Sequence, residues 1–260
     1  MTARPLLEIR DVRRSFGGLQ AVAGISFTLT EGEICALIGP NGAGKTSLFN
    51  LLAGQLPCEG GTVFFRGKRI SGLPPHAIWR RGVSRTFQIT AAFANLTVLE
   101  NVQAALLSRH RRTWNMVAEA ARLLCEPAEA LLLRLNLRGR ARATCAELSF
   151  AELKRLELAL ALANDPALLL LDEPAAGLSA GERVELMELI GALRRERNLT
   201  VLFTEHDMEV VFSVAERIIV LHQGRILADG LPQDVRRDPE VQRIYLGGGG
   251  RTPGGRGAGG

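Results

Sequence analysis

Residues 39–47 read GPNGAGKTS and stand between the apolar run ICALI and the apolar-periodic segment SLFNLLAG. Five consecutive apolar residues are typical of a strand that is buried on both faces, and SLFNLLAG has the spacing of a helix. The loop between them fits the pattern G-x-x-x-x-G-K-[ST], with Gly39, Gly44, Lys45 and Thr46 at its fixed positions. Strand, glycine loop and helix in this order predict a site for phosphate groups.

The residue types in this loop suit a polyphosphate. Glycines allow successive backbone N–H groups to converge on phosphate oxygens, and the helix directs the positive end of its dipole toward them. Lys45 would reach the β and γ phosphates, and the Thr46 hydroxyl would bind Mg²⁺. We therefore expect a nucleoside triphosphate, bound by Gly39, Asn41, Gly42, Gly44, Lys45, Thr46 and Ser47.

The composition predicts a globular chain without a membrane span. Its 260 residues, 47% of them hydrophobic, are enough to bury a full core. No apolar stretch reaches the roughly 18 to 20 residues that cross a bilayer, because LALALANDPALLLL is interrupted by Asn164, Asp165 and Pro166. Glu8 and Asp11 interrupt the apolar core of any signal peptide. We expect the chain to stay in the cytosol.

The cysteines and the charge favour no further ligand. The four cysteines are far apart and show no CxxC spacing, which predicts neither a zinc site nor a disulfide framework. A net charge of +5 suits nucleic acid, an anionic membrane face or nucleotide phosphates. The basic runs RHRR (109–112) and RGRAR (138–142) have no interleaved aromatic residues for base stacking. Solvated helix ends are therefore favoured over a nucleic-acid groove, and no nucleic-acid partner is expected.

The chain begins with strands and continues with helices. Short strands are predicted at LLEI, ISFTLT and TVFF in the first ~70 residues. In ISFTLT, Ile25, Phe27 and Leu29 alternate with polar residues, as in a half-buried antiparallel strand. From Thr97 to about Ala163 the pattern is helical, and it starts with a capping box in TVLE.

The second half alternates strands with helices. Two buried strands, ALLLL and TVLFTEH, flank a helix in ERVELMELIGALRRE, which predicts an α/β fold with a parallel sheet. IIVLHQGRILADG has the pattern of a hairpin that turns near Gln223 and Gly224. The tail GGGGRTPGGRGAGG has no side chains that would form a core, so we expect it to be disordered.

The segment LLLLDEP supplies two carboxylates at the end of a buried strand. Asp172 would enter the coordination shell of the metal ion, and Glu173 would polarise a water molecule for attack on the γ phosphate. The alternative is that both carboxylates cap the next helix. The glycine loop upstream favours the catalytic interpretation.

The order of these motifs resembles a known family. GPNGAGKTS, Gln88 in RTFQ, LSFAE at 148–152, LLLLDEP and His206 in TEHD follow one another as in the nucleotide-binding subunit of ATP-binding cassette (ABC) transporters. The resemblance covers about residues 6–246. It implies the fold of an ABC ATPase: a P-loop core with a parallel sheet, an N-terminal antiparallel β-subdomain and an inserted α-helical subdomain.

The resemblance implies roles for further residues, with ATP and Mg²⁺ bound. Phe16 would stack on adenine, Gln88 would contact Mg²⁺ and the attacking water, and His206 would contact the γ phosphate. Two subunits would face each other head to tail, so that Ser149 and the backbone N–H of Ala151 complete the ATP site of the other subunit. The alternatives are that Phe16 packs at a strand end, that Gln88 is a surface loop residue, and that His206 is a strand-end histidine capping Asp207.

Three stretches are similar to the ATPase subunits of branched-chain amino acid uptake systems, whose relatives also handle amides and urea: FGGLQAV, SRTFQITAAFANLTVLENV and VQRIYLG. This similarity implies a cassette over 1–246, a helical subdomain over about 89–163 and a separate tail over 247–260. It implies permease subunits and a second ATPase subunit, identical or related, as partners, and an extracytoplasmic solute-binding protein as an indirect one. The chain would lie on the cytoplasmic face of the cell membrane.

The segment LSFAE departs from the family pattern, which is LSGGQ or, in this subgroup, LSYGQ. Ala151 and Glu152 stand where glycine and glutamine are usual. A methyl group and a negative charge near the partner's γ phosphate predict a weakened but functional site. The double variant Ala151→Gly/Glu152→Gln should therefore hydrolyse ATP faster than the wild type. Leu160 and Ser179 likewise replace an arginine and an aspartate that are common in relatives.

Three functions fit these motifs. The first is a transport ATPase, whose closure on ATP is transmitted to permeases through the region around residues 89–93. The second is a soluble ATPase switch acting on nucleic acid or ribosomes, which the basic charge supports but the single cassette without a coiled-coil insert disfavours. The third is a module that senses ATP with weak or no turnover, which the altered segment LSFAE supports. The presence of Lys45, Asp172, Glu173 and His206 argues against it. The first is our prediction.

Overall fold

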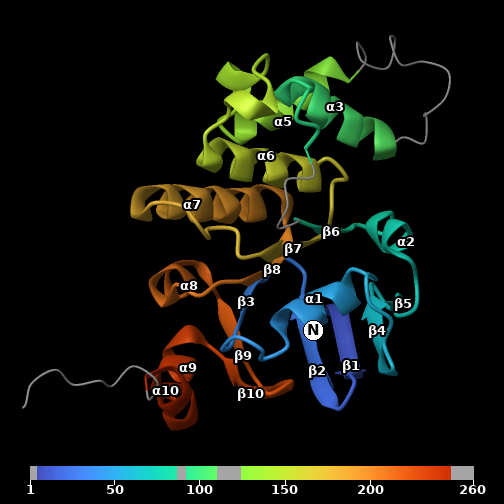
Figure 1. Cartoon of the computed structure of the whole chain (residues 1–260), viewed down its shortest axis with the longest axis vertical. Coiled ribbons are helices and arrows are strands. Elements are labelled where there is room, and N and C mark those ends of the chain that lie inside the picture. Colours follow the sequence, from blue (N-terminus) through green and yellow to red (C-terminus); the bar gives the residue numbers. More distant parts are fainter. Residues whose placement is uncertain (1–4, 87–91, 110–123, 247–260) are drawn as a thin grey trace, which may run out of the picture.

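The computed structural model describes residues 5–86, 92–109 and 124–246, with backbone only for Tyr245 and Leu246. Within these ranges the chain forms two β-sheets with helices around them (Figure 1). The strands are β1 (Pro5–Phe16), β2 (Leu19–Thr30), β3 (Ile34–Ile38), β4 (Gly60–Phe65), β5 (Lys68–Arg69), β6 (Val83–Arg85), β7 (Leu168–Asp172), β8 (Thr200–Thr204), β9 (Arg217–His222) and β10 (Arg225–Gly230). The helices are α1 (Lys45–Leu52), α2 (Pro75–Trp79), α3 (Val98–Arg109), α5 (Cys125–Arg134), α6 (Phe150–Leu162), α7 (Ala180–Arg197), α8 (Met208–Val214), α9 (Pro232–Arg237) and α10 (Pro239–Leu246), with 3₁₀ turns at Arg138–Arg140 and Cys145–Glu147.

The first strands form an antiparallel sheet in the order β2-β1-β4-β5. In β2 the side chains of Ile25, Phe27 and Leu29 are buried, whereas Ser26 and Thr28 are exposed. Because successive side chains of a strand point to opposite faces, this alternation leaves one face of the sheet for the core. The predicted antiparallel strands are confirmed.

The second sheet has the order β10-β9-β3-β8-β7-β6, and the strands from β9 to β6 are parallel. All five residues of β3 are buried. Ile34, Ala36 and Ile38 face one hydrophobic core with the helices α3, α5, α6 and α7, whereas Cys35 and Leu37 face a second core with α1 and the antiparallel sheet. Burial on both faces explains why ICALI is continuously apolar. The predicted α/β fold with a parallel sheet is confirmed.

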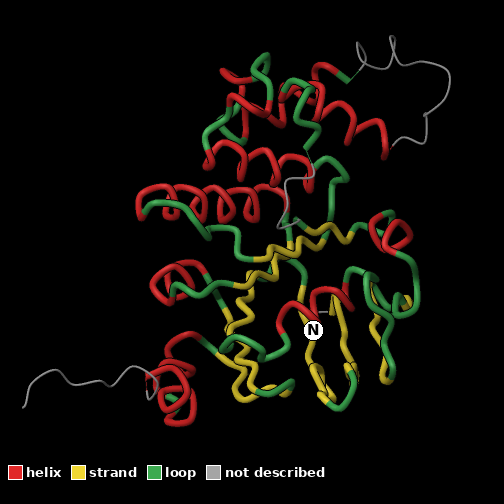
Figure 2. The backbone as a smooth tube through the Cα atoms, viewed as in Figure 1, coloured by secondary structure: helices red, strands yellow, loops and turns green. Residues whose placement is uncertain are grey.

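Helices α3, α5 and α6 pack against one another at one end of the molecule, away from the antiparallel sheet (Figure 2). The predicted capping box precedes α3: the Thr97 backbone N–H donates to Glu100 Oε2 at 2.7 Å, and the Glu100 backbone N–H donates to Thr97 Oγ1 at 3.2 Å. These bonds satisfy two N–H groups that the first turn of a helix leaves free.

The hairpin of β9 and β10 turns at Gln223 and Gly224, as predicted. Both residues have positive φ angles, +48° and +74°, as a two-residue type I′ turn requires. The Gly224 backbone N–H donates to Ala43 O at 3.0 Å, and its carbonyl accepts from the Ala23 N–H at 2.8 Å. The turn therefore supports the glycine loop from one side and β2 from the other.

Membrane-spanning helices and disulfide bonds were both unexpected from the sequence, and the described residues bear on each. Of the helices in the ranges given above, none is both long and apolar enough to cross a membrane. All four cysteines lie in those ranges and are free thiols. The tail 247–260 and its predicted disorder lie outside the described residues.

Candidate functional site

The glycine loop runs from the end of β3 to the start of α1. Its last residue before the helix, Gly44, has φ +105°, and a side chain at this position would collide with the carbonyl oxygen of Ala21. Only glycine adopts this conformation without strain, and only glycine fits the space. Gly39 and Gly44 therefore hold the two ends of the loop tightly against neighbouring backbone.

A hollow of about 280 Å³ lies over this loop and contains most of the residues predicted to bind the nucleotide. Phe16, at the end of β1, lines this hollow and is 44% exposed. The Arg14 guanidinium lies 5.0 Å from the centre of the Phe16 ring. The hollow is lined by Phe16, Leu19, Ala21, Asn41, Gly42, Ala43, Gly44, Lys45, Thr46, Ser47 and Glu173. The exposed ring is thus free to stack on a planar ligand.

Lys45 is folded into the loop that precedes it. Its Nζ donates to Gly39 O at 2.6 Å and to Pro40 O at 3.2 Å. Burial lowers the pKa of Lys45, whereas the carboxylates of Glu173 and Asp172 act in the opposite direction. These contacts hold a cation at the base of the hollow.

Asp172 lies at the end of β7 with both carboxylate oxygens in hydrogen bonds. Thr204 Oγ1 donates to Oδ1 at 2.8 Å, and Arg85 Nη2 donates to Oδ2 at 2.8 Å. Asp172 does not cap the next helix, because α7 has Ser179 as its N-cap, in a capping box with Glu182. The alternative of a helix cap is therefore wrong for Asp172.

Glu173 has the left-handed backbone conformation, with φ +49°. Its backbone N–H donates to the carbonyl oxygen and to Oγ1 of Thr204, at 3.1 and 3.0 Å. A non-glycine residue in this region costs about 1–3 kcal/mol, and such strain is concentrated at functional sites. The strained turn directs the Glu173 side chain to the hollow, which it lines.

His206 follows β8 and lies beside Glu173. Its Nε2 is 2.8 Å from Glu173 Oε1. The cap of α8 is Asp207 itself, whose Oδ1 accepts from the backbone N–H groups of Glu209 and Val210 at 3.0 and 3.4 Å. His206 therefore faces the carboxylate at the hollow.

The oxygen donors here fit a magnesium ion. Mg²⁺ prefers hard oxygen ligands and is usually held by one or two carboxylates together with substrate phosphates. Thr46 lines the hollow, whereas Asp172 is buried and does not line it, although each of its oxygens, having accepted one bond, retains a lone pair. Among the described residues no group of three acidic, histidine or cysteine side chains forms a complete protein cage. Gln88, the third predicted ligand, lies outside the described residues.

Ser149 and Ala151 do not line this hollow and instead begin α6. Ser149 is the N-cap: its Oγ accepts from the Glu152 backbone N–H at 3.2 Å, and its own N–H donates to Glu152 Oε2 at 2.8 Å. Arg140 Nε lies 2.9 Å from Glu152 Oε1. The hydrogen bond from Ser149 lowers the pKa of Glu152, with a contribution from Arg140. The charge predicted to weaken this segment is thus paired within the chain.

Three residues that the sequence analysis did not single out hold the site together. Thr204 bonds the backbone of Glu173 and the side chain of Asp172, Arg85 bonds Asp172, and Arg140 bonds Glu152. Thr204 ends the mostly apolar strand β8, and this polar position is the signal that was available for it, whereas β6 (VSR) gave no such signal for Arg85. Arg140 was visible only as part of RGRAR.

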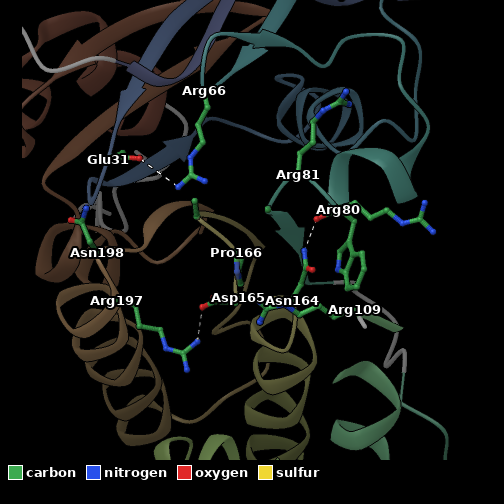
Figure 3. A pocket seen from close by; sticks show the side chains of 13 residues that line it. Glu31, Arg66, Arg80, Arg81, Arg109, Asn164, Asp165, Pro166, Arg197 and Asn198 are labelled. Atoms are coloured by element: carbon green, nitrogen blue, oxygen red, sulfur yellow. Dashed lines mark hydrogen bonds and ion pairs between the residues drawn. The ribbon is translucent and has the colours of Figure 1, made fainter. Parts of the chain in front are cut away.

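A larger hollow of about 610 Å³ lies at the opposite, amino-terminal edge of the parallel sheet (Figure 3). Arg66 lies 3.6 Å from Glu31, and Arg109 and Arg197 lie 3.3 and 3.5 Å from Asp165. It shares no lining residue with the hollow over the glycine loop. Arg109, the first residue of RHRR, lies on α3, and the rest of that run, residues 110–112, lies outside the described residues.

Comparisons with known proteins agree with this arrangement. A family model described as ABC transporter matches residues 22–176, and one described as branched-chain amino acid ATP-binding cassette transporter matches residues 225–251. The high-affinity branched-chain amino acid transport ATP-binding protein BraF of Pseudomonas aeruginosa is 41% identical over 255 residues, which cover 94% of this chain and 99% of BraF. The corresponding protein LivG of Salmonella typhimurium is 42% identical over 257 residues, with the same coverage.

Solved structures of ATP-binding cassettes from ABC transporters have the same fold. A cassette in its ADP conformation superposes with a TM-score of 0.84 at 29% identity and covers 94% of this chain and 100% of its own. A nucleotide-free cassette superposes with a TM-score of 0.83 at 29% identity and covers 93% and 99%. The fold predicted from the resemblance is confirmed.

Proposed function

The chain belongs to the ABC transporter family of ATP-binding proteins, and we propose that it is the ATP-hydrolysing subunit of an importer for branched-chain amino acids. The observation that carries this proposal is the 41–42% identity to BraF and LivG, which extends over almost the whole of both chains. Uptake of amides or urea, predicted for relatives of this subgroup, is the alternative substrate class.

The residues around the hollow suit the hydrolysis of ATP. Phe16 would stack on the adenine, and Lys45 would leave the carbonyl oxygens of its own loop to bind the β and γ phosphates. Mg²⁺, when bound, would neutralise charge on the phosphates, held by Thr46, Asp172 and Gln88. The backbone N–H groups of the glycine loop would make the remaining contacts with the phosphates.

Glu173 would act as the general base. Its carboxylate would accept a proton from the water that attacks the γ phosphate, a role for which a side chain must be within hydrogen-bond reach of that water. The contact of 2.8 Å between His206 Nε2 and Glu173 Oε1 supports a role for His206 in orienting this carboxylate and in contacting the γ phosphate.

A second subunit would complete the site. Ser149 and Ala151 stand at the start of α6 and away from the hollow of their own chain. The start of a helix carries free N–H groups and positive dipole charge, which suit the γ phosphate of an ATP molecule on another subunit. We therefore propose a head-to-tail pair, with an identical or a related ATPase subunit.

Permease subunits would bind beside β6. A mostly apolar hollow of about 290 Å³ lies there, and its lining includes Ser84, Arg85 and Thr86. Its apolar lining includes Pro75, Ile78, Trp79, Val83, Leu160 and Ala161. An exposed apolar recess of this kind suits an inserted side chain of a partner. This arrangement would place the chain on the cytoplasmic face of the membrane, with a solute-binding protein as an indirect partner.

The test is affinity purification of the tagged chain from its own membranes in mild detergent, followed by mass spectrometry. The proposal predicts polytopic permeases in the eluate, together with any second ATPase subunit. The variant Lys45→Ala should retain these partners, whereas Trp79→Asp, which introduces a charge into the apolar recess, should lose them. Recovery only in the soluble fraction, with nucleic acid or ribosomes, would contradict the proposal and support a soluble switch.

A further inference from the structure

Arg85 is the last residue of β6, and its side chain forms a buried ion pair with Asp172. The side chain of Arg85 is 9% exposed and that of Asp172 is 2% exposed, and Arg85 Nη2 donates to Asp172 Oδ2 at 2.8 Å. A buried ion pair needs several well-made hydrogen bonds to offset the loss of hydration of both ions. The other bonds of this guanidinium therefore matter.

The second arm of the Arg85 guanidinium reaches the helix that follows the glycine loop. Nη1 donates to Asn50 Oδ1 at 2.5 Å and to Gln55 Oε1 at 2.7 Å. The guanidinium also lies 5.7 Å from the centre of the Phe49 ring. Asn50 stands about one helical turn after Thr46 on α1, so Arg85 contacts the helix that carries the Thr46 hydroxyl.

One rigid group thus joins the two elements that carry the expected metal ligands. The guanidinium is planar, and its N–H groups have fixed directions, so bonds to Asn50 and to Asp172 together restrict the separation of α1 from the end of β7. Thr204 holds the other oxygen of Asp172. With both oxygens held, the orientation of the carboxylate is set before any metal ion binds.

We infer that Arg85 is a positioning residue for Mg²⁺, which orients the Asp172 carboxylate and sets its distance from Thr46. This inference rests on the proposed Mg-ATP site. Residues that hold metal ligands in place typically contribute 10- to 100-fold to metal affinity. Arg85 does not line the hollow over the glycine loop, so it would act through Asp172.

The test measures how binding of a fluorescent ATP analogue to the purified full chain depends on Mg²⁺. In Arg85→Met, the Mg²⁺ concentration for half-maximal binding should rise about 10- to 100-fold. Binding of the same analogue in EDTA should stay within about twofold of the wild type, because the glycine loop is unchanged. Arg85→Lys keeps the positive charge but loses the planar set of N–H donors. Its Mg²⁺ concentration for half-maximal binding should therefore rise by a smaller factor.

The matched control is Arg197→Met at the opposite edge of the sheet, where the arginine is also paired with an aspartate, Asp165. It should leave the Mg²⁺ dependence unchanged. If Arg85→Met does not fold, Arg85→Lys and Asn50→Ala decide, since each disturbs the bridge while leaving a cation beside Asp172. An unchanged Mg²⁺ dependence in the folded Arg85 variants would overturn the inference. So would a loss of binding in EDTA as large as the loss in the presence of Mg²⁺. Wild-type protein that binds no ATP analogue at all would instead overturn the proposed function.

Discussion

The glycine loop before α1 and the segment 148–152, which forms the start of α6, are both expected to present helix N–H groups to phosphate. In the glycine loop, Gly44 has φ +105° and lies against the backbone of Ala21. In the second segment, Ala151 lies in the first turn of α6, where an ordinary helical backbone is sufficient. A side chain is excluded in the first case and tolerated in the second.

This difference explains why one motif is intact and the other is not. At the two fixed glycines of the loop, Gly39 and Gly44, steric contact with neighbouring backbone leaves no room for a side chain. LSFAE departs at positions 151 and 152, and Arg140 pairs with the added charge of Glu152. A motif that acts through helical backbone therefore accepts new side chains when a neighbouring residue compensates for them.

The largest expected effect lies on the glycine-loop side, at Glu173. Glu173→Gln removes the proposed base and should lower the ATPase rate by about 10²- to 10⁴-fold. ATP affinity should remain close to that of the wild type, because the glycine loop is untouched. The control is Glu188→Gln, an exposed carboxylate on α7, which should keep the full rate. A Glu173→Gln variant with wild-type turnover would remove Glu173 from the mechanism.

The steric difference between the two loops is tested by exchanging glycine and alanine. Gly44→Ala should lower kcat/KM for ATP by about 10²-fold, since the loop must move away from the Ala21 carbonyl oxygen and the phosphate contacts lose their geometry. Ala151→Gly should change the rate by less than about threefold, because both residues adopt the helical backbone there. Steady-state ATPase assays of both variants suffice. Comparable losses in the two would contradict the steric explanation.

Phe16 tests the adenine end of the hollow. Phe16→Ala should weaken ATP binding about 10-fold, within the range of about 1–3 kcal/mol for stacking of a base on an aromatic side chain. Leu19→Ala is the matched control, because Leu19 is also exposed and lines the same hollow. Titration with a fluorescent ATP analogue compares them. Equal affinities of the two variants would leave Phe16 as strand-end packing.

The smallest loss of activity among the proposed site contacts is expected for the pair of Arg140 and Glu152. Arg140→Gln should slow ATP hydrolysis about 2- to 5-fold when Glu152 is present and hardly at all in a Glu152→Gln background, as for a coupled pair. Because the pKa of Glu152 is lowered, its pairing contributes above the usual glutamate pKa of about 4.3 and is lost only as the pH falls through the lowered value. The non-additivity should therefore be the same at about pH 6 and pH 8. Additive effects would mean that Arg140 does not compensate for Glu152.

The sequence predicts the fold and much of the hollow because these depend on local patterns. Continuous burial of ICALI, the alternation in ISFTLT and the capping box at Thr97 are each determined by residues close in the chain. The contacts of Arg85, Thr204 and Arg140 join residues that are far apart in the chain or depend on a packed geometry. Spacing alone does not contain that information. The boundaries of the helical subdomain at about 89–163, and the roles of the individual site residues, stay predictions.

The most direct measurement is uptake of radiolabelled leucine, isoleucine and valine by cells in which the chain is replaced by its Glu173→Gln variant. Levels of the variant in the membrane fraction, measured in parallel, show whether assembly is intact. We predict that high-affinity uptake is lost while the variant remains in the membrane fraction. Unchanged uptake of all three amino acids, with the variant present at its normal level, would contradict the conclusion that ATP hydrolysis at this site drives their import.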